Sequence, residues 1–226
     1  MRSRYGLVVE VTADGQPLVF RGSPDPGGVH QGRVTAALAR LGVSPAVHAF
    51  IETTTGTWTI AERISPGTPI GDMDPTAIDI EMIGTALRPL AGQPAPAADM
   101  ATLTDWLRSR LTDDSLNDLA PGSQTAPIEQ RQRALAVLDE LEATGSMGLC
   151  HGDASPWNLL LGNDRRLMLI DPRGVAGEVA YDLAVVAINA ASVMPPAMSV
   201  PCLAREGGAD PEHVLAWLTV AEAARV

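Results

Sequence analysis

Three polar side chains stand at short intervals in the segment from Leu149 to Gly174. Asp153 is followed five residues later by Asn158, and Asp171 ends the apolar run Leu167 to Ile170. A carboxylate can accept the proton of a hydroxyl group, and carboxylate and amide oxygens are ligands that Mg²⁺ prefers. Enzymatic phosphoryl transfer depends mainly on positioning and on neutralisation of charge. The segment therefore predicts a phosphoryl-transfer site.

The order of these residues resembles the catalytic and metal-binding loops that kinases share. The pattern is His-Gly-Asp with Asn158 five residues later, then Asp171-Pro172-Arg173-Gly174, then Tyr181-Asp182-Leu183-Ala184. In these details the chain is similar to the aminoglycoside phosphotransferase family. The last two elements are most similar to the branch that contains streptomycin 6-kinases, hydroxyurea phosphotransferases and peptide-antibiotic kinases. Four elements in one order make the resemblance specific.

The resemblance implies a role for each matching residue. Asp153 would be the catalytic base, and Asn158 and Asp171 would bind Mg²⁺. His151 would support the catalytic loop, and Asp182 would anchor it without touching substrate. Taken singly, such residues could equally cap a helix or begin or end a turn. Independent caps and turns have no reason to fall at kinase spacing, which favours the catalytic interpretation.

The fold that the resemblance implies is α+β, a protein-kinase-like bilobal fold. Residues 1–65 would form a reduced N-terminal β lobe, and residues 66–226 a mainly helical C-terminal lobe. Alternating apolar residues, turn residues and helical periodicity support this plan. The elements expected in the first lobe are a hairpin of Tyr5 to Thr12 and Leu18 to Arg21 around the turn Ala13 to Gln16, a loop at Asp25 to Gly28, a helix at Val29 to Leu41, and strands at Val47 to Ile51 and Thr57 to Ile64.

Helical periodicity dominates the second lobe, after a hinge near Ser65 to Gly71. We expect Trp106, Leu107 and Leu111 to form a core stripe, since such stripes are usually packed inside. The helices expected are Pro75 to Leu90, Leu103 to Leu111, Ile128 to Ala143, one that continues after Ala184 to a break at Pro195-Pro196, and Pro211 to Arg225.

The nucleotide-binding half departs from the family pattern. All 16 basic residues are arginine, so Arg21 stands where the family places its phosphate-holding lysine. No acidic residue occurs between Pro26 and Phe50, so the helix cannot supply the usual glutamate partner. Only Met1 to Gly6 precede the hairpin, without a G-x-G-x-x-G pattern, and we expect the first strand and the glycine-rich loop to be absent. Arg21 can still hold phosphate, because a guanidinium group binds it well.

The strand end at Glu62, Arg63 and Ile64 resembles the family's passage into the hinge. There the backbone groups of these three residues would meet the base of ATP or GTP. A solvated strand end is the equally weighted alternative.

Composition limits the classes of partner. The net charge of −11 disfavours nucleic acid and favours a cationic small molecule, or serves solubility alone. Asp113, Asp114 and Asp118 form an acidic patch that could meet such a cation or simply be solvated. The longest apolar stretch is interrupted and too short for a membrane span, and no signal-peptide core follows the basic start, so a cytoplasmic location is expected. Cys150 and Cys202 are expected to be small buried residues.

Three functions are compatible with these features. The favoured one is a small-molecule O-phosphotransferase that uses Mg²⁺ and ATP or GTP to phosphorylate a hydroxyl group of an antibiotic or a metabolite. The second is a catalytically impaired kinase-like protein that binds or regulates a protein partner, which the incomplete nucleotide-binding half supports. The third is metal-assisted hydrolysis of a phosphate ester.

Overall fold

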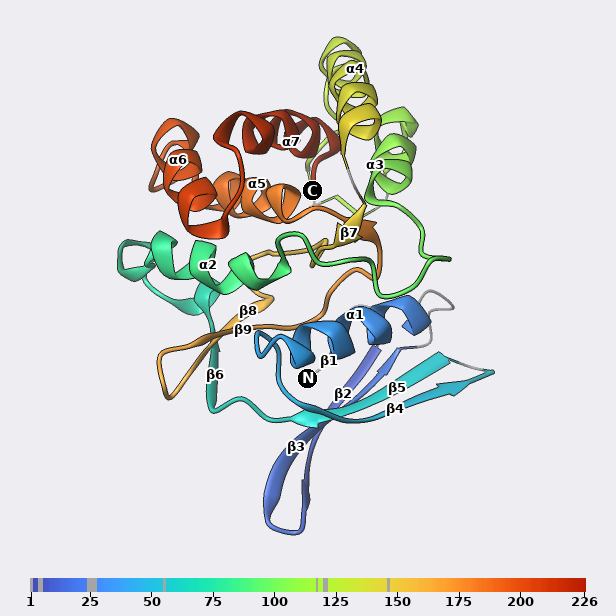
Figure 1. The fold of residues 1–226 in the computed structure, drawn as a ribbon, viewed down its shortest axis with the longest axis vertical. Coiled ribbons are helices and arrows are strands. Elements are labelled where there is room, and N and C mark those ends of the chain that lie inside the picture. The colour runs from blue at the N-terminus through green and yellow to red at the C-terminus, as the bar shows by residue number, and fades with distance from the viewer. Residues whose placement is uncertain are drawn as a thin grey trace.

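The computed structural model describes residues 2–3, 6–23, 28–54, 56–116, 118–119, 122–145 and 147–226. Two features expected from the sequence, Tyr5 as the start of the first hairpin strand and most of the loop 25–28, lie outside these residues. The described part has a small lobe built on a sheet and a larger, mainly helical lobe (Figure 1).

The small lobe contains an antiparallel sheet of five strands in the order β1-β2-β3-β5-β4. Asp14 and Gly15 connect β2 to β3 with φ angles of 51° and 79°, the conformation of a tight hairpin turn. This confirms the hairpin expected from the alternating sequence. The strands are β1 (Arg2–Ser3), β2 (Gly6–Ala13), β3 (Gln16–Ser23), β4 (Val47–Thr53) and β5 (Gly56–Glu62).

The short strand β1 corrects one expectation. Arg2 and Ser3 pair with Leu7 and Gly6 of β2, so a two-residue strand does precede the hairpin. The pairing needs only backbone groups, which is why no side-chain pattern in the sequence predicted it.

Helix α1 (Gly28–Arg40) packs on the sheet and lies between the sheet and the large lobe (Figure 1). Val34 and Leu38, one helical turn apart, are fully buried. The helix ends just before Gly42, as its periodicity predicted. Its position brings its first turns close to the end of β3.

The chain enters the large lobe through β6 (Pro66–Pro69), which pairs with β8 (Leu159–Gly162); β8 in turn pairs with β9 (Leu167–Leu169). Figure 1 shows β6 rising from the small lobe to this second sheet. Strand β5 ends at Glu62 and β6 begins at Pro66, while the lobe boundary after residue 65 stays a prediction. Another short pair, β7 (Gly148–Leu149) with β10 (Ala176–Gly177), flanks the catalytic segment.

The helix expected from Pro75 to Leu90 is wrong in extent. Asp79 accepts hydrogen bonds from the backbone N–H groups of Glu81 and Met82, so it caps a shorter helix that begins at residue 80. The segment is divided into the 3₁₀ helix η2 (Pro75–Ala77), α2 (Ile80–Leu87) and the 3₁₀ helix η3 (Arg88–Leu90).

The other predicted helices are confirmed, including the break at Pro195-Pro196. Helix α5 lies at the centre of the lobe and packs against α6 and α7, and its Leu183, Ala184 and Ala187 are fully buried. The helices are α3 (Leu103–Thr112), α4 (Ile128–Thr144), α5 (Val179–Ala190), α6 (Pro196–Gly207) and α7 (Pro211–Ala224).

Within the described residues, none of the helices has the length and apolarity needed to cross a bilayer. Cys150 is buried, as expected, whereas Cys202 is only half-buried and lies beside Glu81. The prediction that both cysteines are core residues is therefore wrong for Cys202, because its helix α6 presents this side toward the surface.

Candidate active site

Asp182 holds the start of the loop formed by residues 151–158, called here the catalytic loop. Its two carboxylate oxygens accept hydrogen bonds of 2.8 Å from the backbone N–H groups of His151 and Gly152. Asp182 is fully buried, and burial raises its pKa to about 7 although both hydrogen bonds act to lower it. The residue lies at the buried start of α5, so it ties the loop to a largely buried helix of the lobe.

His151 supports the same loop from within. Burial lowers its pKa to about 4, so the imidazole is neutral at pH 7. Nε2 lies 2.8 Å from the carbonyl oxygen of Ile170, and Nδ1 accepts a bond of 3.3 Å from the N–H of Asp153. Only the tautomer with the proton on Nε2 satisfies both contacts. His151 thus connects the loop to the strand end before Asp171. It does not border the cavity that Asp153 and Asn158 line.

Asn158 is oriented by a hydrogen bond within the loop. Its side-chain nitrogen donates to the carbonyl oxygen of Asp153 over 2.9 Å, which leaves the amide oxygen available for another ligand. The backbone carbonyl of Asn158 accepts a bond of 3.0 Å from Ile170. These contacts place Asn158 next to the residue pair Ile170 and Asp171.

Asp171 follows β9 in a left-handed backbone conformation, with φ of 57°. Its Oδ1 lies 2.7 Å from Nε of Arg21, an ion pair between the lobes. Burial is the main cause that raises the pKa of Asp171; Asp153 adds to it and Arg21 opposes it. A second positive charge near this carboxylate would therefore be favourable.

Arg21 contacts α1 through a residue that sequence reasoning missed. Its Nη1 donates a hydrogen bond of 3.0 Å to Oε1 of Gln31. An acidic residue is the expected partner for a cation on this helix, but a glutamine can accept the same bond without a charge. A hydrogen-bonded pair of Arg21 and Gln31 therefore stands in place of the lysine-glutamate pair that the sequence lacks.

Gly174 permits the close approach of α1 to the segment after Asp171. Its φ is +81°, and a Cβ atom at this position would lie 2.6 Å from the backbone nitrogen of Gln31. A side chain would therefore be both strained and in collision with the helix. The glycine of the Asp-Pro-Arg-Gly element thus brings Gln31 within reach of the site.

A cavity of about 750 Å³, called here the catalytic cavity, gathers the predicted residues Arg21, Asp153, Asn158 and Asp171. Asp153 is 41% exposed and lies 3.6 Å from a guanidinium nitrogen of Arg173. Nε of Arg173 donates a bond of 3.0 Å to the carbonyl oxygen of Gly152. The cavity therefore combines a solvent-accessible carboxylate with several guanidinium groups, among them those of Arg21 and Arg173.

A smaller cavity of about 240 Å³, the hinge cavity, shares Arg21 and Asp171 with the catalytic cavity and is bordered by Glu62, Arg63 and Ile64. The N–H of Glu62 donates to Ala46 and that of Arg63 to Pro17, at 2.9 and 3.1 Å. These two N–H groups are therefore not free to bind a nucleotide base. Of the backbone donors expected here, Ile64 remains without an assigned partner among the described residues.

The expected core stripe holds only in part for Trp106, which is partly buried and packs against the core but also borders a cavity. Leu107 and Leu111 are buried, but Trp106 borders the catalytic cavity, and the guanidinium carbon of Arg173 lies 4.0 Å from its ring centroid. Arg110 approaches the same ring at 5.3 Å. The periodicity of apolar residues correctly predicted that Trp106 lies on the inward side of α3. Whether another segment packs over that side depends on the tertiary structure.

The acidic patch is mostly neutralised. Asp114 pairs with Arg131, and Asp118 lies 2.6 Å from Arg110. Asp113 accepts hydrogen bonds from Ser115, which lower the pKa of its carboxyl group. Of the three, Asp118 borders the catalytic cavity.

Comparison with known families identifies the group to which this geometry belongs. A family model described as "Phosphotransferase enzyme family" matches residues 5–214. The chain belongs to the phosphotransferase enzyme family. No curated protein matches the sequence. Membership confirms the predicted enzyme class, a kinase-type phosphotransferase.

Solved structures show that this phosphotransferase has a kinase-like fold, as the sequence predicted. A choline/ethanolamine kinase family protein from Mesorhizobium loti matches with a TM-score of 0.66 at 16% identity, covering 97% of this chain and 77% of that chain. An aminoglycoside-3'-phosphotransferase of type VIII matches with a TM-score of 0.62 at 22% identity, covering 96% and 88%. A hygromycin B–ADP complex of a third phosphotransferase matches with a TM-score of 0.61 at 15% identity, covering 97% and 81%.

The donor atoms of the phosphotransferase site fit Mg²⁺. Asp171 offers a half-buried carboxylate, and a bound cation would oppose the effect of burial that raises the pKa of this group. Asn158 offers its unused amide oxygen. Among the described residues there is no group of three or more His, Cys, Asp and Glu side chains suited to a metal. Mg²⁺ is commonly held by one or two protein oxygens together with substrate phosphates and water, which is the arrangement this pair of residues allows.

Proposed function

We propose that this phosphotransferase moves the γ-phosphoryl group of a Mg²⁺-bound nucleoside triphosphate to a hydroxyl group of a small molecule. The observation that carries the proposal is that Arg21, Asp153, Asn158 and Asp171, which come from two lobes, border one cavity. These four residues supply a base, two metal ligands and a phosphate-binding cation. Positioning these groups is most of what such a reaction needs.

Asp153 would accept the proton of the acceptor hydroxyl, because its carboxylate is exposed to the cavity while its backbone is held by His151. Asn158 and Asp171 would hold Mg²⁺, which supplies charge neutralisation on the phosphates when bound. Arg21 would hold a phosphate oxygen in place of the missing lysine, steadied by Gln31. Arg173 would stabilise the negative charge beside Asp153.

The nucleotide would place its base in the hinge cavity near Glu62, Arg63 and Ile64, with ATP and GTP both as candidates. The solved complexes with ADP in similar folds support a nucleotide co-substrate. The N–H of Ile64, which has no assigned partner in the described part of the chain, would be the main backbone donor to the base. The reaction would take place in the cytoplasm, where such nucleotides are supplied.

The acceptor would be an antibiotic or a metabolite. Solved relatives of the fold act on spectinomycin or bind hygromycin B, which supports a small hydroxylated acceptor. The Asp-Pro-Arg-Gly and Tyr-Asp-Leu-Ala elements support a place in the branch of streptomycin 6-kinases and hydroxyurea phosphotransferases.

A kinase-like binding or regulatory protein is the second candidate. The observation that favours it is the ion pair between Arg21 and Asp171, which joins the two groups that nucleotide and metal would need. A protein that had lost catalysis could keep this pair permanently closed.

Calorimetric titration with ATP and with GTP, each with and without Mg²⁺, distinguishes the two candidates. The enzyme should bind one nucleotide in a Mg²⁺-dependent manner, and Asp171→Asn should remove that dependence while leaving weak Mg²⁺-free binding. Asp164→Asn, an exposed change outside the cavity, serves as the matched control. Absence of binding to both nucleotides in the wild type would support the binding protein.

A further inference from the structure

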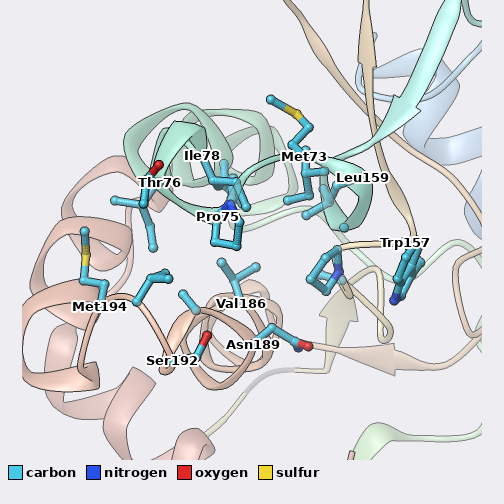
Figure 2. Close-up of a pocket in the computed structure, with 18 residues that line it drawn as sticks. Met73, Pro75, Thr76, Ile78, Trp157, Leu159, Val186, Asn189, Ser192 and Met194 are labelled. Carbon is cyan, nitrogen blue, oxygen red and sulfur yellow. The ribbon is translucent and has the colours of Figure 1, made fainter.

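A third cavity, about 480 Å³ in volume, lies on the other side of the catalytic loop from Asp153. It is enclosed by the segment from η1 (Ile70–Asp72) to α2, by the end of α5, and by the loop itself. Figure 2 shows Pro75 and Val186 facing one another across it, with Trp157 at one end and Met194 at the other. This volume is typical of a site for a small molecule. We call it the apolar cavity, since its lining is mainly aliphatic, including Ile70, Met73, Ile78, Ile83, Val186 and Met194.

The apolar cavity and the catalytic cavity share a wall. Asp153 and Ser155 border the catalytic cavity, whereas the intervening Ala154 borders the apolar cavity. Asn189 of α5 borders both. Its side-chain nitrogen donates to the carbonyl oxygen of Val185 over 2.8 Å, so its amide oxygen is left for a ligand. The two cavities therefore adjoin at Asn189.

Trp157 offers apolar surface at the end of this cavity. Trp157 is 58% exposed. The backbone N–H of Gly71 donates to the carbonyl oxygen of Pro156 over 3.0 Å, and a Cβ at Gly71 would lie 3.0 Å from the indole. The segment after the hinge thus holds the tryptophan in place while part of the ring stays uncovered.

The charges of the catalytic cavity disfavour a polycation. Each of its carboxylate side chains in the described structure already has an arginine near it: Asp118 with Arg110 at 2.6 Å, Asp171 with Arg21 at 2.7 Å, and Asp153 with Arg173 at 3.6 Å. The ring face of Trp106 is likewise occupied by Arg173. A polyamine would therefore have to compete with an arginine at each of these carboxylate side chains and at the ring face of Trp106, which disfavours a polycationic acceptor.

We propose that the acceptor is an uncharged hydroxyl compound that carries an apolar group, with its hydroxyl at Asp153 and its apolar group in the apolar cavity. This rests on the proposed phosphotransferase function. In the reaction the acceptor oxygen forms a bond to the γ-phosphorus and gives its proton to the carboxylate of Asp153. The bond from the γ-phosphorus to the bridging oxygen breaks, and the nucleoside diphosphate leaves with the electron pair.

A series of 1-O-alkylglycerols from the methyl to the hexyl ether tests this assignment, with kanamycin as the polycationic comparison. Formation of nucleoside diphosphate and phosphorylated product gives kcat/KM, and calorimetry with a non-hydrolysable nucleotide gives affinity. Each added methylene should increase both quantities about three- to fourfold until the cavity is full. Kanamycin should have a lower kcat/KM than the hexyl ether. A value independent of chain length, or a preference for kanamycin, would overturn the proposal.

Two neighbouring substitutions locate the effect. Ser192→Phe fills the apolar cavity from its rim, whereas Ala191→Phe adds the same ring at an exposed residue that does not border it. The chain-length dependence should disappear in Ser192→Phe and should persist in Ala191→Phe. Equal behaviour of the two variants would contradict the placement. A different result would show that the proposed phosphotransferase function is wrong. In that case nucleotide binds with Mg²⁺, but no compound in the series, kanamycin included, receives a phosphoryl group.

Discussion

Arg21 at the end of β3 donates a hydrogen bond of 3.0 Å to Gln31 of α1, and its Nε lies 2.7 Å from Asp171 of the other lobe. One guanidinium group therefore joins the sheet, the helix and the segment that carries Asp171. The single ammonium group of a lysine could contact only some of these partners at once. The planar guanidinium group of arginine has five N–H donors and can contact several.

Loss of the glutamine should weaken the phosphate site. In Gln31→Ala, Arg21 keeps its ion pair with Asp171 but loses the bond that orients it, and bonds to charged groups are worth about 1.5–3 kcal/mol. We expect kcat/KM for the nucleotide to fall roughly tenfold or more. Gln132→Ala, at an exposed position of α4, controls for the change of residue type and should leave steady-state kinetics unchanged. Unaltered kinetics in Gln31→Ala would exclude it as a positioning residue.

The close approach at Gly174 can be tested with a matched glycine. Gly174 and Gly92 both have positive φ, at 81° and 71°, but a Cβ at Gly92 meets nothing within 4 Å. Both alanine variants should lose about 1–2 kcal/mol of folding free energy from backbone strain. Only Gly174→Ala should also displace α1 and weaken nucleotide binding, as measured by calorimetry. Equal nucleotide affinities would show that the contact with Gln31 does not position the site.

Removal of the base should separate chemistry from binding. Asp153→Ala should lower kcat by about 10²- to 10⁴-fold, the usual contribution of a general base, with little change in nucleotide affinity. The backbone N–H of Asp153 still meets Nδ1 of His151 in this variant, so the loop should keep its shape. Single-turnover kinetics with Asp164→Ala as the surface control measure the effect. A variant as active as the wild type would remove Asp153 from the mechanism.

Asp182 and His151 should give opposing slopes of stability against pH. The pKa of Asp182 rises on folding from 3.8 to about 7, so between these values the folded state binds more protons and stability falls as pH rises. The pKa of His151 falls from 6.5 to about 4, so the folded state binds fewer protons and stability rises with pH in that range. The two slopes partly cancel in the wild type.

Urea denaturation at several values between pH 4.5 and 6.5 separates the two groups. Relative to the wild type, Asp182→Asn should make the free energy of unfolding rise more steeply with pH, and His151→Gln should make it rise less or fall. Both variants should be destabilised, because each breaks buried hydrogen bonds of the loop. Parallel pH profiles for all three proteins would show that neither group titrates differently on folding.

The catalytic segment was the most predictable part of the chain. Asp153 and Asn158 lie in one loop, so their separation is limited by a few backbone bonds, and the apolar run before Asp171 predicts a strand that ends beside them. The hairpin at Asp14 and Gly15 was predictable for the same reason, because the turn needs only local positive φ angles.

Contacts between distant segments were not predictable in this way. The 3₁₀ ends around α2 depend on Asp79 capping a helix that periodicity alone extends further. Trp106 was assigned to the core because a hydrophobic stripe shows which side of a helix faces inward, but not whether a cavity lies there. Gln31 was overlooked because an uncharged partner has no charge pattern to reveal it.

The family, the loop that carries Asp153 and Asn158, and the order of the main elements could be predicted from the sequence, since these depend on residues that are near neighbours along the chain. Which groups meet across the lobes depends on the three-dimensional fold: Arg21 meets Gln31 and Asp171, an arginine lies beside each carboxylate side chain of the catalytic cavity, and the apolar cavity lies behind the loop. Packing of whole helices and strands sets these distances, because it balances many weak contacts that no short stretch of sequence contains.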